Sequence, residues 1–576
     1  MVKIFKSISR QGILFAYLLI TVADLFIIRR SSWIFEQVSG IRFWINYVFS
    51  SLIIFAILYF LRYRNDKILS KILFLILFAF PMLTQPIFFA AYDKFITPFG
   101  FSIFVSDTAM IFELGGTNLP VLQILFLIPV LILVYRAIFI GKAIKVRIWR
   151  PILIYFLGFS AFVHGVIGWF GHADFQHASS AFYINLTETA IRSSYSFKVD
   201  RVMPVATDIK AKKPRAIIFV IGESTVKRHM SLFGYSRKTT PGLDSLKNLG
   251  VLTTFNNAIS VGNKTNLSVP YMLTGIEGPD PQGRFYRNPT IFDYAKANGY
   301  RTLFISAQEL RWGNLDRVLA GRSVDILKYG SDFSAQVDIL KGADDSVVLS
   351  RFILPYIDTV SAPFFMVYQM DGSHYPYNAH SPSHVKKFFP ESEPNGINAY
   401  DNTILYTDRN LTKLITALKM RFPDGIVTFS QDHGQGLSGH AGYNDNYVNE
   451  TVENSLFISA PKALIDSLSF NSSSPVTQID IFATLLDIWK QQPSEPIDGL
   501  SLFKTIPSGR LRICSEYMPT FHNVPVATII FPNSESWQVD FSRKVVQKIG
   551  TQEAFPYSSL PDSISLLLDS RLRKQR

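Results

Sequence analysis

Five long apolar segments dominate the first third of the chain, and they constrain its fold more than any other feature. Each is about 17 to 24 residues long, enough for a helix to cross a hydrocarbon core of about 30 Å. The first ends at Arg29 and Arg30 with no small-residue cleavage site, so we expect it to stay attached rather than be removed as a signal peptide. The sequence therefore predicts five transmembrane helices, at residues 12–28, 43–61, 68–91, 119–140 and 151–170.

The lysines and arginines of the short loops predict how these spans are oriented. The N-terminus and the second and fourth loops are basic, whereas residues 92–118 hold one lysine against three acidic residues. Because basic loops stay on the cytoplasmic side, everything after about residue 171 is expected outside the cytoplasm. The first loop, with Arg29, Arg30 and Arg42, is an exception to this pattern.

The net charge and the cysteine content exclude several classes of protein. The net charge is +13, and we attribute it to basic residues that flank membrane segments and face anionic headgroups, not to nucleic-acid binding. Cys514 is the only cysteine of the chain. An intrachain disulfide and a CxxC metal site are therefore excluded.

From residue 215 the pattern changes to short β-branched runs, each followed by a turn and then by helical periodicity. We expect, for example, a helix at about 290–298 and a strand at about 301–306, separated by Gly299. Such alternation is typical of a mostly parallel sheet covered by helices. The expected parts are a transmembrane domain, interfacial helices with a linker, and an α/β domain, at residues 1–171, 172–214 and 215–576.

Polar residues follow three of the predicted strands, at the point where each strand ends. Glu223 follows "RAIIFVIG", His374 follows "APFFMVYQMDGS", and Asp432 with His433 follows "DGIVTFSQ". Ligand sites in such sheets lie at the carboxyl ends of the strands, so these side chains are expected to converge. Two carboxylates and an imidazole suit zinc, with manganese as the alternative. Each residue taken alone also fits a helix start, a turn or a hydrogen-bonded loop.

Thr265 lies in the polar turn "SVGNKTNLSVP", ahead of an apolar run able to form a helix. A hydroxyl at that point lies beside helix N–H donors, which favour a phosphate anion. Threonine is a weak nucleophile, and metal coordination is a standard way to activate it. The residues alone leave Thr239, Thr240 and Ser268 as competing hydroxyls.

In combination these stretches resemble the bacterial phosphoethanolamine transferases that modify lipopolysaccharide, members of the alkaline phosphatase and sulfatase superfamily. The closest resemblance lies in "FVIGESTVKRHMSLFGYSRKTTPGL", residues 219–243. Further similar stretches follow in the family's order: "VGNKTNLSVPYMLTG", "QMDGSHYPY", "YDNTILYTD", "SQDHGQGLSGH", and "TQIDIFATLLDI" with "IDGLSL". The resemblance implies an N-terminal five-helix transmembrane bundle in the bacterial inner membrane and a C-terminal α/β sulfatase-like domain in the periplasm.

The resemblance also implies a site and a reaction. Glu223, Asp432 and His433 would hold zinc, with Thr265 as the fourth ligand and as the nucleophile that becomes covalently modified. His374 and His440 would contact the transferred phosphate or a second metal. The implied reaction moves phosphoethanolamine from phosphatidylethanolamine to a lipopolysaccharide glycolipid, at lipid A or the core, or to another glycolipid.

The departures from the family pattern concern the acceptor. Val261 and Tyr271 stand where lipid A-modifying members have cysteines, and Gln435 replaces a more usual glutamate. The lack of disulfides is more similar to members that act on the core or on another glycan.

Three alternative functions stay open. A phosphoglycerol transferase of the lipoteichoic-acid synthase kind shares the spans, the threonine and the metal set, although "MSLFGYSRKTTP" argues against it. A hydrolase of the sulfatase or phosphodiesterase type would transfer to water, but Cys514 in "RICSEYMP" lacks the sulfatase pattern C/S-x-P-x-R. A non-catalytic receptor with an inactivated fold would be expected to lose a metal ligand, and none is missing.

Overall fold

The structure is a computed structural model, and it divides into two compact units, Met1–Ser196 and Phe197–Arg576. The residues that it describes are 2–29, 41–92, 95–96, 101, 120–140, 176–194, 201–205, 213–280, 283–309, 321, 323–335, 337, 341–391, 396–437, 449–515, 526–540, 545–549, 551, 553–562, 564–566 and 568.

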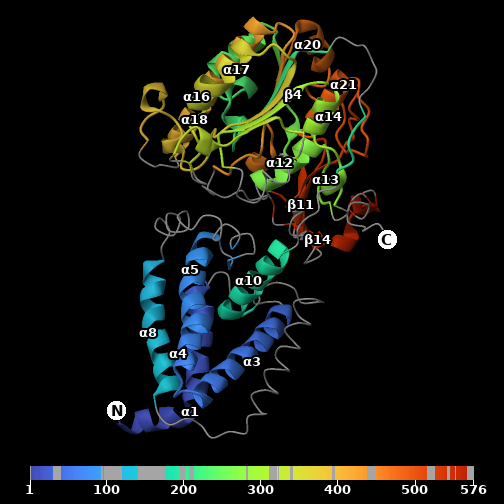
Figure 1. Cartoon of the computed structure of the whole chain (residues 1–576). Coiled ribbons are helices and arrows are strands. Elements are labelled where there is room, and N and C mark those ends of the chain that lie inside the picture. Colours follow the sequence, from blue (N-terminus) through green and yellow to red (C-terminus); the bar gives the residue numbers. More distant parts are fainter. Residues whose placement is uncertain are drawn as a thin grey trace. The chain divides into compact units, whose positions relative to one another are not determined.

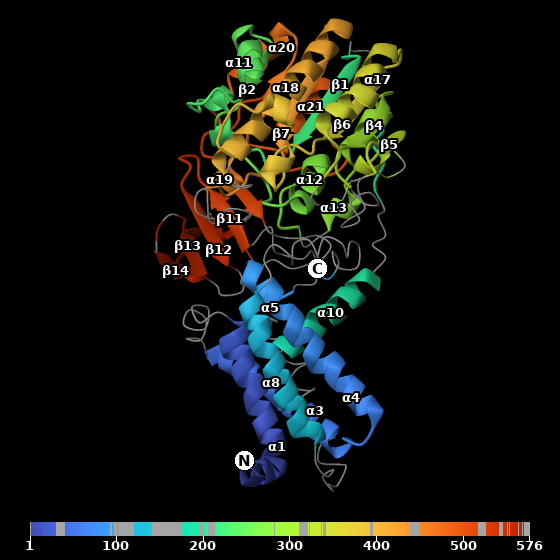
Figure 2. The same ribbon diagram turned by 90° about the vertical axis from the view of Figure 1, so that its left-hand side faces the viewer.

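The described part of the first unit consists of helices (Figures 1 and 2). They are α1 (Val2–Val22), η1 (Ala23–Ile28), α3 (Ile41–Tyr63), α4 (Ile68–Phe74), η2 (Leu75–Ala79), α5 (Phe80–Tyr92), α8 (Val121–Phe139) and α10 (Ala178–Ser194). Large apolar side chains such as Leu122 and Phe126 are exposed on α8, at 73% and 66%. Exposed apolar surface of this extent is typical of helices that face lipid.

Three described helical stretches are long and apolar enough to cross a membrane: Phe43–Tyr63, Ile68–Ile87 and Val121–Phe139. They coincide with the second, third and fourth predicted spans. The first predicted span corresponds to a shorter apolar helix, Gly12–Ile28. The fifth predicted span, residues 151–170, lies outside the described residues, so the predicted number of five stays a prediction.

A seven-stranded sheet forms the centre of the second unit, in the order β2-β8-β7-β1-β6-β4-β5. Its strands are β1 (Ala216–Gly222), β2 (Leu252–Thr254), β4 (Arg301–Ser306), β5 (Ile326–Lys328), β6 (Phe364–Gln369), β7 (Ile426–Gln431) and β8 (Phe457–Ser459). The five strands from β7 to β5 are parallel. Strand β8 pairs antiparallel with β7, and β2 pairs antiparallel with β8. The predicted mostly parallel sheet is therefore confirmed, including the strand expected at 301–306.

Helices cover both faces of this sheet (Figure 1). Alternate residues of β1 point to opposite faces: Ile217 and Phe219 pack with α12, α14 and α21, whereas Ile218 and Val220 pack with α17 and α18. Strands buried on both faces are apolar throughout, which explains the continuous run of β1. The helices are α11 (Pro241–Asn248), α12 (Thr265–Thr274), α13 (Arg284–Arg287), α14 (Ile291–Ala297), α16 (Asp345–Val348), α17 (Leu354–Thr359), α18 (Ile397–Arg421), α19 (Asn449–Val452), α20 (Lys462–Ser469) and α21 (Asp480–Ile488).

Short helical turns and two smaller sheets complete the described part of the second unit. The turns are η5 (Lys227–His229), η6 (Ser231–Phe233), η8 (Gly330–Asp332), η9 (Leu349–Ile353), η10 (Tyr377–Ala379), η11 (Ser383–Val385) and η12 (Tyr557–Ser559). The first sheet pairs β3 (Ala258–Ile259) with β9 (Val476–Thr477) in parallel. The second is antiparallel, with the strands β10 (Arg512–Ser515), β11 (Val526–Ile530), β12 (Ser536–Asp540), β13 (Val545–Lys548) and β14 (Ala554–Pro556). This five-stranded sheet was not predicted from the sequence.

Candidate metal centre

Two neighbouring parallel strands bring the predicted acidic residues together. Strands β1 and β7 pair so that Gly222 lies opposite Gln431, and the next residues along the chain are Glu223 and Asp432. The Asp432 amide donates a hydrogen bond to the Gly222 carbonyl at 2.7 Å, which continues the pairing past the strand ends. The convergence predicted from the strand ends is therefore present for these residues.

Glu223, Asp432 and His433 form a buried cluster whose ligand atoms all lie within 4.8 Å of one another. The three residues are 2%, 0% and 2% exposed. His433 Nε2 lies 3.3 Å from Asp432 Oδ2 and 3.8 Å from Glu223 Oε1. Within the described part of the chain, this is the one group of three acidic or imidazole side chains close enough to share a metal ion.

Thr265 is the first residue of α12, and its hydroxyl points into this cluster. Thr265 Oγ1 donates a hydrogen bond to Asp432 Oδ2 at 2.7 Å. The same oxygen lies 3.4 Å from Glu223 Oε2 and 3.5 Å from His433 Nε2. The three competing hydroxyls form hydrogen bonds with backbone groups. Thr239 and Ser268 donate to the carbonyls of His229 and Lys264, and Thr240 accepts from the Leu232 amide.

The protonation behaviour of the cluster fits a cation site. Burial and the neighbouring Glu223 carboxylate raise the pKa of Asp432 well above its usual value. Burial opposes the ionisation of Glu223 as well, but the charges of His433 and His374 lower its pKa overall. Burial also lowers the pKa of His433, although the charge of Glu223 opposes this, and a lowered pKa favours the neutral imidazole that binds metals. Two adjacent buried carboxylates and a neutral imidazole are a donor set that zinc accepts.

Hydrogen bonds from the surrounding residues orient each of these groups. Asp432 Oδ1 accepts from the amides of Ser224 and His433, at 3.0 and 2.7 Å. His433 Nδ1 lies 2.7 Å from the Gly434 carbonyl, so Nδ1 carries the hydrogen and Nε2 is left as the ligand atom. Such contacts fix a ligand before an ion binds.

Gln308 is a site residue that the sequence analysis missed. Its side-chain Nε2 donates to Glu223 Oε2 at 2.8 Å and to the Met370 carbonyl at 3.0 Å. Gln308 follows the end of β4, in the same sheet and at the same edge as Glu223. The strand-end rule that selected Glu223 could have selected Gln308, but an amide is a less conspicuous signal than a carboxylate.

His374 lies near the cluster without belonging to it. It is half-buried in the loop after β6, and its Nδ1 contacts the Tyr375 carbonyl at 2.6 Å. The loop can run close to Glu223 because Gly372 has no side chain, and a Cβ at that position would lie 3.0 Å from the Glu223 backbone. Gly372 also has φ +53°, a conformation that favours glycine. His440, the other residue expected to contact phosphate, lies outside the described residues.

Comparisons with known proteins agree with this fold. Residues 215–490 match the sulfatase family. The chain is 31% identical over 240 residues to phosphoethanolamine transferase EptC of Escherichia coli O18:K1:H7, which covers 40% of this chain and 41% of that protein. It is 27% identical over 261 residues to phosphatidylethanolamine transferase Mcr-1 of Escherichia coli, covering 41% and 46%. The chain thus spans less than half the length of these curated relatives.

A solved structure extends the likeness to the membrane unit. The integral membrane protein lipooligosaccharide phosphoethanolamine transferase A (EptA) from Neisseria meningitidis has a TM-score of 0.57 at 17% identity. The match covers 83% of this chain and 95% of that chain, and at this identity it bears on the fold alone.

These findings define a sulfatase-type, alkaline-phosphatase-like α/β domain at the C-terminus and a membrane domain like that of EptA. Within that class, the chain is similar in sequence to bacterial phosphoethanolamine transferases, as its motifs predicted.

Proposed function

We propose that this protein transfers phosphoethanolamine from phosphatidylethanolamine to a lipopolysaccharide glycolipid, through a covalent intermediate on Thr265. It would act as a multi-pass protein of the bacterial inner membrane, with residues 215–576 as the catalytic domain in the periplasm. The observation that carries the proposal is the position of Thr265 Oγ1, 2.7 Å from Asp432 Oδ2 and within 3.5 Å of Glu223 and His433. A nucleophile in the middle of a metal-ligand set suits phosphoryl transfer.

Glu223, Asp432 and His433 would hold zinc, or manganese as the alternative, with the Thr265 hydroxyl as a further ligand. When bound, the ion supplies positive charge that lowers the pKa of the hydroxyl and offsets charge on the phosphoryl oxygens. Thr265 also begins the ten-residue helix α12, whose positive end favours a phosphate beside it.

In the first step the Thr265 oxygen attacks the phosphorus of phosphatidylethanolamine, and the bond from phosphorus to the diacylglycerol oxygen breaks. Asp432 Oδ2 accepts a hydrogen bond from the Thr265 hydroxyl, which supports Asp432 as the group that receives the proton. The diacylglycerol oxygen takes up that proton from Asp432 as it leaves. In the second step an acceptor phosphate or hydroxyl attacks the same phosphorus, and the Thr265 oxygen leaves. His374 and His440 would contact the transferred phosphate.

The adduct on Thr265 tests this function directly. The full-length protein is incubated with phosphatidylethanolamine or with phosphatidylglycerol, without acceptor, and the peptide that contains Thr265 is weighed by mass spectrometry. We expect a phosphoethanolamine adduct from the first lipid and none from the second. A phosphoglycerol adduct would identify a different transferase. Rapid release of free phosphoethanolamine would indicate a hydrolase.

The acceptor is identified separately, from the membrane glycolipids of cells with and without the protein. A mass increase of one phosphoethanolamine group, located to lipid A or to a core sugar, is the expected result. An unchanged glycolipid profile in the presence of the Thr265 adduct would show that the acceptor is a different molecule.

A further inference from the structure

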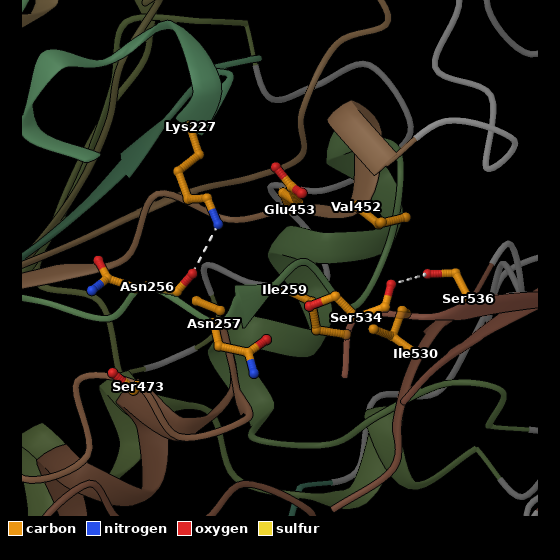
Figure 3. Close-up of a pocket in the computed structure, with 11 residues that line it drawn as sticks. Lys227, Asn256, Asn257, Ile259, Val452, Glu453, Ser473, Ile530, Ser534 and Ser536 are labelled. Carbon is orange, nitrogen blue, oxygen red and sulfur yellow. Dashed lines mark hydrogen bonds between the residues drawn. The ribbon is translucent and has the colours of Figure 1, made fainter. Parts of the chain in front are cut away.

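A polar pocket lies in the Phe197–Arg576 unit, and none of the metal-centre residues lines it (Figure 3). Its volume is about 230 Å³. Pockets for drug-sized ligands measure about 300 to 1,000 Å³, so this one suits a single sugar unit or headgroup. Its polar lining comes from separate segments of the chain: Lys227, Asn256, Glu453, Ser473, Ser534 and Ser536.

Lys227 is the cation of the pocket lining, and the carboxylate of the lining is engaged by another residue. Lys227 Nζ donates to the Asn256 carbonyl at 2.9 Å, and it forms no ion pair with any residue that the structure describes. The one acidic residue of the lining, Glu453, is already paired with Arg228 through two contacts of 2.6 and 2.8 Å. An ammonium has three donors, so Lys227 keeps two for a ligand.

The electrostatic surroundings support the same conclusion. Burial lowers the pKa of Lys227, Glu453 opposes this effect, and the charges of Arg228 and Arg512 lower the pKa further. An anion in the pocket would relieve the repulsion among these cations.

The neutral part of the lining suits a sugar. The side chains of Asn256, Ser473 and Ser534 form no hydrogen bond with another described residue, so their amide and hydroxyl groups remain for a ligand. Ile259, Val452 and Ile530 supply apolar surface beside them (Figure 3). A cation, several hydroxyl-bonding groups and an apolar wall match the anionic group, the hydroxyls and the C–H face of a charged sugar.

The walls of the pocket belong to the loops that carry the candidate metal centre. Lys227 follows Glu223 by four residues, and Ile259 in β3 precedes Thr265 by six. The carbonyl of Glu453 accepts a hydrogen bond of 2.6 Å from the side chain of Gln431, the residue directly before Asp432. Each loop of the centre therefore continues into a wall of the pocket.

We propose that this pocket binds an anionic sugar of the acceptor glycan, one that bears a phosphate or a carboxylate, and so holds the acceptor while its reactive group meets Thr265. This inference rests on the proposed transferase function for its role, but not for the binding itself. The pocket is then a determinant of acceptor choice and has no part in the reaction with the donor.

The two half-reactions separate this role from the chemistry. Lys227→Gln in the full-length protein should form the Thr265 adduct from phosphatidylethanolamine at the wild-type rate, because Lys227 does not contact the metal centre. Transfer of the group to a lipopolysaccharide acceptor should show a KM for the acceptor raised about tenfold, as expected for the loss of one charged hydrogen bond, with kcat unchanged.

Two further variants serve as controls for that experiment. Lys227→Arg retains the charge and should restore most of the acceptor affinity. Lys462→Gln removes a lysine that is 78% exposed on α20, outside the pocket, and should change nothing. An unchanged acceptor KM in Lys227→Gln would overturn the proposal, and so would an equal loss of adduct formation, which would show a purely structural role.

Direct binding tests the pocket even if the transferase function fails. Glucose 6-phosphate, glucuronate and glucose are titrated calorimetrically into the full-length wild-type protein and into Lys227→Gln. We expect an anionic sugar to bind the wild type about tenfold more tightly than the variant, and glucose to distinguish them little. A difference for only one of the two anions identifies which charged group the pocket takes. Equal binding of both anions to wild type and variant would refute the pocket.

If the wild type forms no Thr265 adduct but still shows this binding difference, the proposed function fails and the pocket stands. If the adduct forms and the binding difference is absent, the pocket fails and the function stands.

Discussion

Two of the deeply buried clusters of charged side chains among the described residues are built on opposite plans. In the membrane unit, Asp24 is fully buried and faces Arg29, whose Nε lies 3.3 Å from its carboxylate. Asp24 also accepts hydrogen bonds of 2.8 Å from the Tyr47 hydroxyl and the Ala178 amide. Arg29 further contacts the Gln176 carbonyl and the ring of Phe95. Negative and positive charge are balanced inside this cluster.

The cluster in the catalytic unit is not balanced. Glu223 and Asp432 are two carboxylates side by side, and among the described residues neither forms an ion pair with a lysine or an arginine. Buried charge is costly unless it is paired. A balanced buried cluster therefore joins helices to one another, as Asp24 does with α3 and α10. An unbalanced cluster of carboxylates is suited to bind a metal cation.

The largest expected effect concerns the residue at the centre of the unbalanced cluster. Thr265→Ala should lower transfer by on the order of 10³-fold or more, because it removes the proposed nucleophile. Zinc should still bind through the three remaining ligands, as measured by metal analysis of the purified protein. Ser268→Ala, which removes a hydroxyl of the same helix that bonds to a backbone carbonyl, should retain activity. Transfer that persists in Thr265→Ala would assign the nucleophile to another residue.

Removal of the metal should have the next largest effect. Chelation should abolish adduct formation on Thr265, and added zinc should restore it together with a higher Tm. Binding to the folded state at about 1,000 times Kd adds about 4 kcal/mol of stability. An activity indifferent to chelators and an unchanged Tm would argue against a metal centre.

Matched substitutions in the two clusters should change stability in opposite directions. Asp24→Asn removes the carboxylate that Arg29 faces and should cost about 3 to 5 kcal/mol, as for other broken buried pairs. Asp432→Asn removes one of two like charges and should raise the Tm of the metal-free protein, while it abolishes the stabilisation by zinc. Thermal unfolding of the full-length protein in detergent measures both. Destabilisation of equal size at the two sites would contradict the comparison.

The smallest expected effect concerns Asp345, a buried carboxylate outside both clusters. Asp345 accepts hydrogen bonds from the Tyr368 hydroxyl at 2.7 Å and from the amides of Asp371 and Gly372 at 3.0 Å. Burial, with Asp371 adding to it, raises the pKa of Asp345 to about 7. Asp345 thus differs from Asp24: its charge is removed by protonation below about pH 7 and is not balanced by a neighbouring cation among the described residues.

The sign of the resulting pH dependence follows from that pKa. Because the folded pKa lies above the unfolded value, the protonated group stabilises the fold below about pH 4, and this stability is lost as the pH rises to about 7. Between pH 5 and 8 the wild type should lose ~2 kcal/mol more than Asp345→Asn. The comparison is made by thermal unfolding at the two pH values. Asp358→Asn, at an exposed position of α17, should behave like the wild type, and identical pH profiles for Asp345→Asn and the wild type would refute the assignment.

The strand-end pattern predicted the position of Glu223, Asp432 and His433, because a parallel sheet brings the carboxyl ends of neighbouring strands together. It could not rank the hydroxyls, since the approach of Thr265 depends on how α12 packs against β1. The family resemblance supplied that choice. The five-stranded C-terminal sheet was not predicted, because its short antiparallel strands leave a weaker pattern than a buried parallel strand does.

The pairing of β1 with β7 has a consequence for how the site is assembled. The hydrogen bond from the Asp432 amide to the Gly222 carbonyl forms when the sheet forms, so two of the candidate ligands come from backbone that is already immobile. These ligands are held in place before an ion binds, so ion binding costs the chain little conformational entropy. Fraying of this sheet edge would separate Glu223 from Asp432, so a mutation that frays β7 should weaken metal affinity without touching a ligand.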